Sequence, residues 1–329
     1  MWTESAKKNI RVFAASLLLS LFFWTGINAF DSATYAILSW KILEQNPQLL
    51  TAQLHTQQLE KTLAKELPLR IAHTKDPEIN AKAVAISFLD LQGKERPLFG
   101  HQENTPLPIA SISKLMTALV AEISFSKDDI IEIRQPLYGS GFGGRFQAGT
   151  SFTEKNLLHS LLIESNNDVA VYFAQEVGEK EFVNQMNQTA SNLGFTQMVF
   201  FNPTGLDPEQ GKAINRASAK ETASLMAYLI YNHPDIFSIL SIQEFRLHTT
   251  NAQYHHTVKN TNQLLEYDKW PTRVLGGKTG TTTMAGECLV LVLKAPKNKG
   301  YVIITLLGSN NRFKEASSLV EWVYKSYRW

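Results

Sequence analysis

Cysteine is almost absent from this chain of 329 residues, which contains only Cys288. A single cysteine excludes an internal disulfide framework and any zinc site built from cysteine ligands. Because Cys288 lies in the strand-like apolar run 287–292, we expect a buried and unreactive thiol. An H-E-x-x-H pattern is also missing, and we interpret the one adjacent histidine pair, His255–His256, as surface histidines. We therefore expect no metal ion and no other cofactor.

A strong charge of either sign is also missing. The chain has 32 Lys and Arg against 30 Asp and Glu, a formal net charge of +2. These charges are spread along the sequence rather than gathered in a basic patch, which argues against a nucleic-acid partner. No internal repeat or low-complexity segment is present. With 44% hydrophobic residues, the chain can bury a large core, as one big domain or two lobes.

One long uncharged segment runs from Val12 to Phe30, 19 residues rich in Leu and Phe, and follows basic residues within 1–11. It is long enough to cross a hydrocarbon core of about 30 Å. Basic residues before such a segment predict a cytoplasmic tail at 1–11 and an anchor at 12–30, with the rest of the chain outside. The alternative is a signal peptide cleaved after Ala29. Both interpretations export the remainder of the chain.

Residues 31–75 are expected to form a helical stalk, and residues 76–329 a catalytic domain. The stalk prediction rests on an amphipathic pattern of leucines among Gln, Lys and Glu. These leucines, spaced four or five residues apart, are Leu50, Leu54, Leu59, Leu63 and Leu67.

The catalytic region alternates between strand and helix patterns. A turn at 92–94 separates two strand-like segments, which predicts a hairpin. Apolar residues at helical spacing follow Ala110, and a long helical middle separates this part from two further alternating segments. We expect an α+β fold, an antiparallel sheet flanked by helices with an inserted helical subdomain. The expected strands are 82–90, 96–99, 287–293 and 301–307, and the expected helices are 157–177, 180–193, 219–231 and 312–327.

Three short motifs follow one another with wide gaps. Each is weak alone, because S-x-x-K also occurs at Ser5/Lys8 and Ser124/Lys127. Their order S-x-x-K, S-x-N and K-T-G is the specific signal, and it is typical of serine enzymes that act on D-amino-acid peptides or β-lactams. The motifs are Ser111-Ile-Ser-Lys114, Ser165-Asn-Asn167 and Lys278-Thr-Gly280.

The first motif predicts a nucleophile and its base. Ser111 falls near the start of a helix, and Lys114 lies about one turn further along the same face. A serine hydroxyl attacks only when a neighbouring base takes its proton. Lysine becomes such a base when burial or a nearby cation lowers its pKa, and Lys278 is a candidate for that cation.

The other motifs predict substrate contacts. The Ser165 hydroxyl can relay a proton, and the Asn167 amide can both donate to and accept from a substrate amide. Lys278, Thr279 and Gly280 are expected on an edge strand along a cleft, where Gly280 permits close approach of a substrate backbone. The Thr279 and Thr281 hydroxyls, with Arg312 from the segment before the last helix, are expected to bind a terminal carboxylate.

The chain resembles the low-molecular-mass penicillin-binding proteins, which are serine-type D-alanyl-D-alanine carboxypeptidases. The resemblance covers about residues 80–329. It implies the β-lactamase/DD-peptidase fold, peptidoglycan stem peptides as substrates, β-lactams as covalent inhibitors and a location at the bacterial cell membrane with an extracytoplasmic catalytic domain. The segments that carry it are Ala110–Thr117, Glu164–Ala170, Phe201–Leu206, Asn260–Leu265 and Gly277–Gly280.

The same resemblance implies the function of each motif residue. Ser111 would be the acylated nucleophile and Lys114 its general base. Ser165 and Asn167 would relay a proton and orient the substrate, which Lys278 and Thr279 would hold. The family's oxyanion hole would map to the backbone N–H groups of Ser111 and Thr281.

Three features depart from the family pattern. Many members have Ser-Gly-Asn where this chain has Asn166 in the middle, so we expect a bulkier side chain beside the cleft. Members commonly carry a C-terminal β-rich domain with an amphipathic membrane helix, whereas this sequence ends at Trp329, where the catalytic domain should end. Some relatives have an Arg in the segment occupied here by Asn260–Asn262, so any function of that Arg is lost or moved.

Several other activities are compatible with these motifs. A D,D-endopeptidase that cleaves peptidoglycan cross-links uses the same machinery and is the main alternative to a carboxypeptidase. A class A β-lactamase needs a glutamate in a Glu-x-x-Leu-Asn stretch, and this chain contains no Leu-Asn dipeptide. A catalytically silent murein-binding scaffold is disfavoured because every motif side chain is intact.

Overall fold

The computed structural model describes residues 68–135, 146–207, 213–268, 270 and 272–329. The chain divides into two units, 1–67 and 68–329, and only the second is described. The predicted tail, the anchor or signal segment and the stalk up to residue 67 therefore lie outside the described residues. The last residues of the predicted stalk, 68–75, contain no helix. Instead β1 (Leu69–Arg70) pairs antiparallel with β13 (Tyr327–Arg328), so its backbone hydrogen-bonds to the C-terminal segment.

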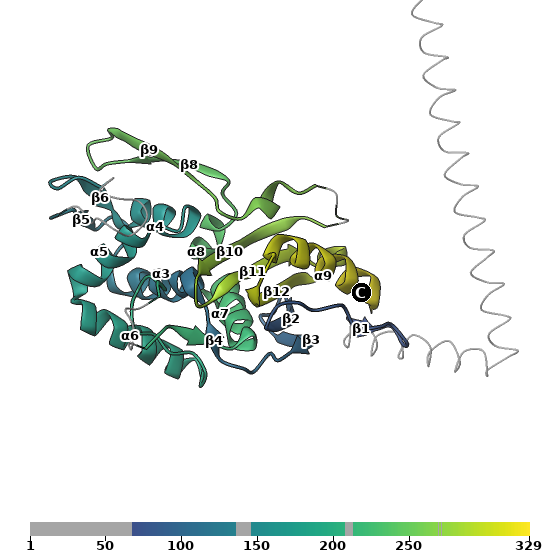
Figure 1. Cartoon of the computed structure of the whole chain (residues 1–329). Helices are drawn as coiled ribbons and strands as arrows, with labels where there is room; N and C mark the ends of the chain where they lie inside the picture. The colour runs from purple at the N-terminus through teal and green to yellow at the C-terminus, as the bar shows by residue number, and fades with distance from the viewer. Residues whose placement is uncertain (1–67, 136–145, 208–212, 269, 271) are drawn as a thin grey trace, which may run out of the picture. The chain divides into compact units, whose positions relative to one another are not determined.

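A five-stranded antiparallel sheet forms the centre of the catalytic domain (Figure 1). Both predicted strand pairs are confirmed, since β2 pairs with β3 and β11 pairs with β12. The K-T-G motif lies on β10 at one edge of this sheet, as the sequence predicted. The strands in spatial order are β10 (Val274–Thr282), β11 (Gly286–Lys294), β12 (Gly300–Ser309), β2 (Ala83–Asp90) and β3 (Glu95–His101).

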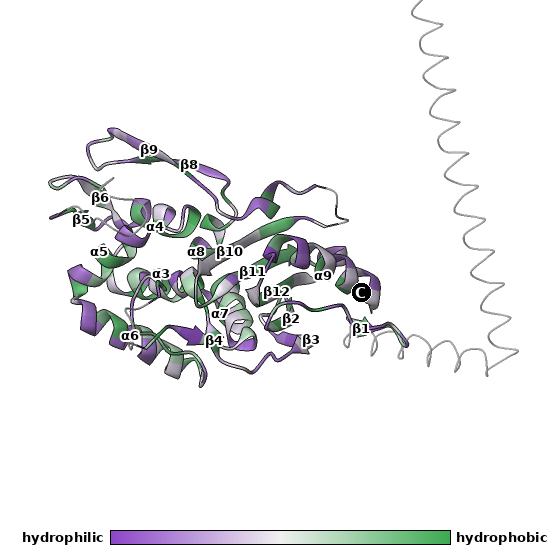
Figure 2. Ribbon diagram, in the orientation of Figure 1, coloured by the Kyte–Doolittle hydropathy of each residue, from purple (hydrophilic) through white to green (hydrophobic). Residues whose placement is uncertain are grey.

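Both faces of the sheet are covered, which explains why the central strands are apolar throughout. Along β11, Cys288, Val290 and Val292 enter one hydrophobic core, while the alternate leucines enter the other. Helix α7 (Ala219–Asn232) packs on the first face and α9 (Arg312–Ser326) on the second (Figure 2). Strands buried on both faces show continuous apolar runs rather than strict alternation. Burial raises the pKa of Cys288 to about 11, so the thiol is inert as expected.

A helical lobe is inserted between the two halves of the sheet. Its helices share their core with the α7 face, so lobe and sheet form one packed body. The α+β fold predicted from the sequence is confirmed. The lobe and its connections contain η1 (Ala110–Ser113), α3 (Lys114–Ser124), α4 (Glu154–Ile163), α5 (Asn167–Val177), α6 (Glu179–Asn192) and α8 (Pro234–Ile239). The shorter elements are β4 (Leu107–Pro108), β5 (Ile130–Glu132), β6 (Ser151–Thr153), β7 (Arg216–Ala217), β8 (Glu244–His248), β9 (Tyr254–Lys259), η2 (Gln263–Glu266) and η3 (Pro296–Asn298).

The helical pattern expected over 157–177 is interrupted at the second motif. Helix α4 ends at Ile163 and α5 begins at Asn167, with Glu164 and Asn166 as the adjoining cap residues. Between them Ser165 adopts a left-handed backbone with φ of 64°. A left-handed residue cannot continue a right-handed helix, so the chain turns here. This turn places the second motif at the start of α5.

Within residues 68–329, apart from the short undescribed gaps, no helix has the length and hydrophobicity needed to cross a bilayer.

Candidate active site

The three motifs meet where the edge strand β10 packs against η1. A Cβ atom placed on Gly280 would lie 2.9 Å from the backbone nitrogen of Ser111. Such a separation is shorter than normal contact, so only glycine permits this packing. Gly280 therefore allows η1 of the same chain to pack closely against the K-T-G strand. This packing brings Ser111 beside that strand.

Ser111 lies in the 3-10 turn η1, not at the N-cap of the helix that follows. The preceding residue, Ala110, has a φ of 48°, an uncommon conformation for alanine. A glycine from another segment packs against it, because a Cβ on Gly205 would lie 1.9 Å from the Ala110 carbonyl oxygen. Strained backbone of this kind persists only where the surroundings enforce it, and it is concentrated at functional sites.

Lys114 is fully buried and has three polar neighbours. Its Nζ atom lies 2.9 Å from Ser111 Oγ, 2.6 Å from Asn167 Oδ1 and 2.7 Å from the Thr204 carbonyl oxygen. The amide oxygen and the carbonyl oxygen can only accept hydrogen bonds. A neutral amine satisfies both with its two N–H groups, which leaves its lone pair for the Ser111 hydroxyl. This geometry is that of a base aimed at Ser111.

Burial also favours the neutral form of Lys114. Desolvation, with a further contribution from the charge of Lys278, lowers the pKa of Lys114 well below its ordinary value. The cation expected from the sequence is therefore present, although burial has the larger effect.

Lys278 connects the K-T-G strand to the second motif. Its side chain is 1% exposed, and Nζ donates to Ser165 Oγ at 2.7 Å and to the Thr279 carbonyl oxygen at 2.9 Å. Burial, followed by the charge of Arg312, lowers the pKa of Lys278 to about 7. The structure thus provides two lysine–serine contacts in one site, Lys114 with Ser111 and Lys278 with Ser165.

Arg312 reaches the end of the K-T-G strand from the start of α9. Its Nη1 atom donates to the Gly280 carbonyl oxygen at 2.8 Å and also contacts Thr281 Oγ1. The guanidinium is half-buried and Thr281 is exposed, so a hydroxyl and a cation lie together at the surface of the site. The neighbouring Thr279 is nearly buried, and its Oγ1 lies 2.5 Å from Thr261 Oγ1. A fixed cation beside two hydroxyl groups is a suitable binding site for a carboxylate.

The segment 201–206 completes the site, although motif reasoning gave its residues no function. Thr204 supplies the carbonyl that accepts from Lys114. Asn202 Oδ1 accepts from the backbone nitrogens of Thr204 and Gly205, at 3.0 and 2.7 Å. Asn215 Nδ2 donates to the Asn202 carbonyl at 2.8 Å and to Ser113 Oγ at 3.0 Å. The family resemblance includes this segment, but a backbone carbonyl that accepts a hydrogen bond cannot be recognised from the type of side chain in the sequence.

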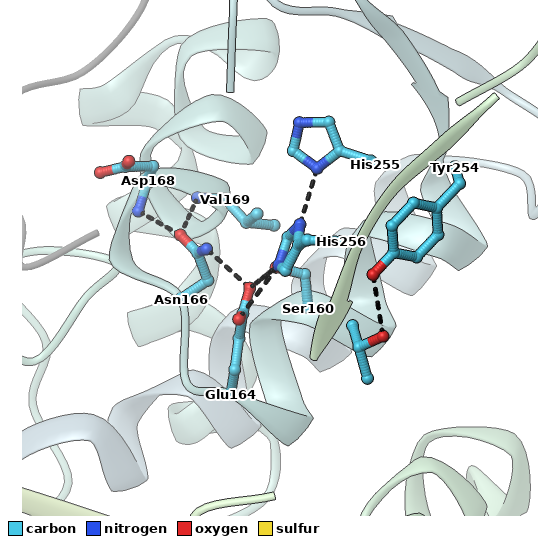
Figure 3. Close-up of polar contacts among 9 residues, drawn as sticks. Ser160, Glu164, Asn166, Asp168, Val169, Tyr254, His255 and His256 are labelled. Atoms are coloured by element: carbon cyan, nitrogen blue, oxygen red, sulfur yellow. Dashed lines mark hydrogen bonds and ion pairs between the residues drawn. The ribbon is translucent and has the colours of Figure 1, made fainter. Parts of the chain in front are cut away.

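Two expectations about side-chain positions are wrong, one for the second motif and one for the histidine pair. Asn166 does not project beside the cleft: it is fully buried, and Oδ1 accepts from the backbone nitrogens of Asp168 and Val169, which caps α5 (Figure 3). His256 is not a solvated surface histidine, since its side chain is only 14% exposed and contacts Glu164. The turn geometry directs Asn166 toward the helix end, and the β8–β9 pairing directs His256 inward, so neither orientation follows from the motif alone.

Within the parts of the chain that the structure describes, no group of three or more His, Cys, Asp or Glu side chains is arranged to hold a metal ion.

Comparison with known proteins agrees with this arrangement. The family model for D-alanyl-D-alanine carboxypeptidases matches residues 71–311. A D-alanyl-D-alanine endopeptidase of Escherichia coli is 28% identical over 75% of this chain and 78% of its own length. The D-alanyl-D-alanine carboxypeptidase DacF of Bacillus subtilis is 28% identical over 70% of this chain and 59% of its own length.

A solved structure shares the fold. Penicillin-binding protein D2 of Listeria monocytogenes, in its ampicillin-bound form, superposes with a TM-score of 0.64 at 26% identity. The match covers 76% of this chain and all of that one. Since the family model spans most of the chain and both motifs and fold agree with it, this chain belongs to the D-alanyl-D-alanine carboxypeptidase family of serine peptidases.

Proposed function

We propose that this protein is a serine D-alanyl-D-alanine carboxypeptidase that removes the terminal D-alanine from peptidoglycan pentapeptides. The observation that carries the proposal is the pair formed by Arg312 and Thr281 at the end of the K-T-G strand. The Arg312 guanidinium and the hydroxyl of Thr281, the residue after Gly280, can together bind a small leaving group that has a free carboxylate. A terminal D-alanine is such a leaving group.

The acylation step uses the two lysine–serine contacts. The neutral amine of Lys114 takes the proton from Ser111 Oγ, which attacks the carbonyl carbon of the penultimate D-alanine. The backbone N–H groups of Ser111 and Thr281 stabilise the oxyanion, and such donors are typically worth about 2.7–4 kcal/mol each in the transition state. Lys114 gives up the same proton, which reaches the amine of the departing D-alanine through the Ser165 hydroxyl, and the hydrogen bond from Lys278 holds that hydroxyl in place. The C–N bond breaks and leaves an ester on Ser111.

The deacylation step reverses the proton transfers. Water loses a proton to Lys114 and attacks the ester carbonyl, and Ser111 Oγ leaves with a proton from the same amine. The products are a tetrapeptide and free D-alanine. Because Lys114 returns to its neutral form, the site is ready for the next substrate, and the reaction cycle uses no cofactor.

A D,D-endopeptidase is the second candidate, and one observation favours it. The Escherichia coli relative, of which this chain covers 78%, is named an endopeptidase. Since an endopeptidase also acylates its serine and transfers the acyl group to water, the motif geometry fits both reactions. The two differ only in the size of the leaving group that the cleft must hold.

Product analysis separates the two candidates. Purified protein is incubated in parallel with a monomeric pentapeptide and with a cross-linked dimer. We expect tetrapeptide and free D-alanine from the pentapeptide, and the Ser111→Ala variant is the matched control. Cleavage of the dimer with the pentapeptide untouched would replace the carboxypeptidase proposal with the endopeptidase one.

We also propose that β-lactams acylate Ser111 and that the enzyme is tethered to the bacterial membrane through residues 12–30, with its site outside the cytoplasm. The ampicillin-bound Listeria relative supports the first statement. The basic residues before an uncharged segment of 19 residues support the second.

A further inference from the structure

Glu164, the residue before Ser165, is a buried carboxylate with an unusually full set of donors. It is 7% exposed, and Oε1 accepts from Ser160 Oγ at 2.7 Å and from Asn166 Nδ2 at 3.0 Å. His256 Nε2 on β9 lies 3.0 Å from Oε1 and 3.1 Å from Oε2 (Figure 3). Burial alone would raise the pKa of Glu164, but the hydrogen bonds from His256, Asn166 and Ser160 outweigh it, and the pKa is lowered. Because an ionised carboxylate can only accept hydrogen bonds, we assign the donor in this contact to His256 Nε2.

Asn166 extends this contact to helix α5. Its Nδ2 atom donates to Glu164, and its Oδ1 atom accepts from the backbone N–H groups of Asp168 and Val169 in the first turn of α5. The residues on both sides of Ser165 are thus held by their side chains. Ser165 itself has the left-handed φ of 64°, which a non-glycine residue keeps only when its surroundings enforce it.

A second contact ties the same loop to the strand that carries His256. The backbone nitrogen of Thr261, just beyond β9, donates to the Ile163 carbonyl at 3.1 Å. The loop between α4 and α5 is therefore joined to the β9 segment on both sides of Lys259, through His256 and through Thr261.

We propose that Glu164 and His256 are positioning residues for acyl transfer, which hold the loop that presents Ser165 and Asn167 to the two lysines. The pair contacts the loop, its helices and the β8–β9 hairpin. Asn167 Oδ1 lies 2.6 Å from Lys114 Nζ, and Ser165 Oγ lies 2.7 Å from Lys278 Nζ. A displacement of the loop would lengthen both contacts at once, and displacements of about 1 Å can cost about 100-fold in rate.

The inference rests on the proposed acyl-enzyme chemistry but not on the choice between carboxypeptidase and endopeptidase. Acylation by a fluorescent penicillin measures the first step in either case. His256→Phe keeps a ring but removes the Nε2–H donor, whereas the amide nitrogen of His256→Gln can take the place of Nε2. His248→Phe is the matched control, because His248 lies on the neighbouring strand β8 and its ring contacts Tyr254 instead of the α4–α5 loop.

Losing a hydrogen bond to a charged group should slow acylation by His256→Phe about tenfold or more. The acylation rate constant of His256→Gln and of His248→Phe should stay within about threefold of the wild type. On peptide substrate, kcat should fall with the KM nearly unchanged, because a positioning pair affects acyl transfer more than substrate binding. Glu164→Gln is the second variant, since it removes the charge at constant shape, and combining it with His256→Phe should add little further loss.

Three results would overturn the inference. The first is a His256→Phe variant that is acylated as fast as the wild type. The second is an equal loss in His256→Gln, because the donor would then be irrelevant. The third is a lower melting temperature with acylation per folded molecule unchanged, which would make the pair purely structural. A wild type that penicillin does not label at all would overturn the acyl-enzyme chemistry and this inference together.

Discussion

The Nζ atom of Lys114 lies 2.9 Å from the Oγ atom of Ser111, and the other two polar neighbours of that amine can only accept hydrogen bonds. Burial favours the neutral amine, and that form can donate to these two oxygens and accept a proton from the Ser111 hydroxyl. The lone pair then faces Ser111, and a permanent cation at position 114 cannot reproduce it.

Lys114→Arg should therefore fail to restore the function that Lys114→Ala loses. Arginine cannot be deprotonated, so it cannot take the serine proton. Both variants should lose about 100-fold to 10,000-fold in the rate of acylation, the usual range for a general base. Stopped-flow or gel-based labelling with a fluorescent penicillin measures this rate. Normal acylation of Lys114→Arg would show that another group is the base.

Covalent labelling should occur at Ser111 alone. Ser124 also has a lysine three residues further on, Lys127, but that lysine is paired with Asp235. Lys114 is buried, whereas Lys127 is exposed to solvent. Only a buried lysine is available as a neutral base. Peptide mass spectrometry of penicillin-treated protein identifies the site, with Ser124→Ala as the matched control. A label on Ser124, or a label that survives in Ser111→Ala, would contradict the assignment.

The rate of acylation should fall as pH rises through about 7. The pKa of Lys278 is lowered to about 7, so its positive charge is present below that pH and lost above it. Lys114 acts in the opposite sense, because it must be neutral, and its pKa is also lowered. Acylation should thus rise with pH at the acidic end and fall at the alkaline end, with apparent pKa values that belong to the coupled pair.

Lys278→Arg provides the test of this profile. Arginine keeps its charge, so the alkaline fall should disappear while some activity is retained. Acylation rates measured from about pH 5 to about pH 9 for wild type and variant are sufficient. An identical alkaline fall in both proteins would assign it to a group other than Lys278.

Much of the fold and of the site could be predicted because the signals are local. The apolar pattern of β11 predicts a buried strand, and the spacing within Ser111–Lys114 puts two side chains on one face. The order of the three motifs then predicts that the segments that carry them, which are η1, the start of α5 and β10, meet in one site. Each of these predictions depends on residues that are close in sequence or on a motif with a known geometry.

The remaining features depend on long-range contacts or on backbone atoms. Glu164 and His256 are 92 positions apart, and no spacing rule joins them. The Thr204 carbonyl acts through its backbone, which every residue possesses. The direction of Asn166 follows from the left-handed turn at Ser165, and residues other than glycine adopt that conformation too rarely to be predicted from sequence.

The N-terminal segment should remain attached in the mature protein. If residues 12–30 form an anchor, full-length protein should fractionate with membranes and require detergent for release, because an apolar segment of 19 residues favours the bilayer. Fractionation followed by N-terminal sequencing measures this, and a variant that begins at residue 31 is the soluble control. Soluble protein with a mature N-terminus at Phe30 would identify the segment as a cleaved signal.

Recognition of a free carboxylate should depend on Arg312. Its guanidinium contacts Thr281 Oγ1 and the Gly280 carbonyl, so a substrate carboxylate in this position would accept charge-assisted hydrogen bonds. Bonds to charged groups contribute about 1.5–3 kcal/mol, so Arg312→Ala should raise the KM for a carboxylate-terminated pentapeptide about tenfold to 100-fold. The same peptide with an amidated C-terminus should be a poor substrate for both proteins, and its kinetics should change little on mutation. Arg312→Lys, which keeps the charge but not the fork of donors, should fall between the two. Steady-state release of D-alanine or its amide measures all of these constants. If Arg312→Ala left the preference for the free carboxylate intact, Arg312 would serve only to hold α9 against the sheet.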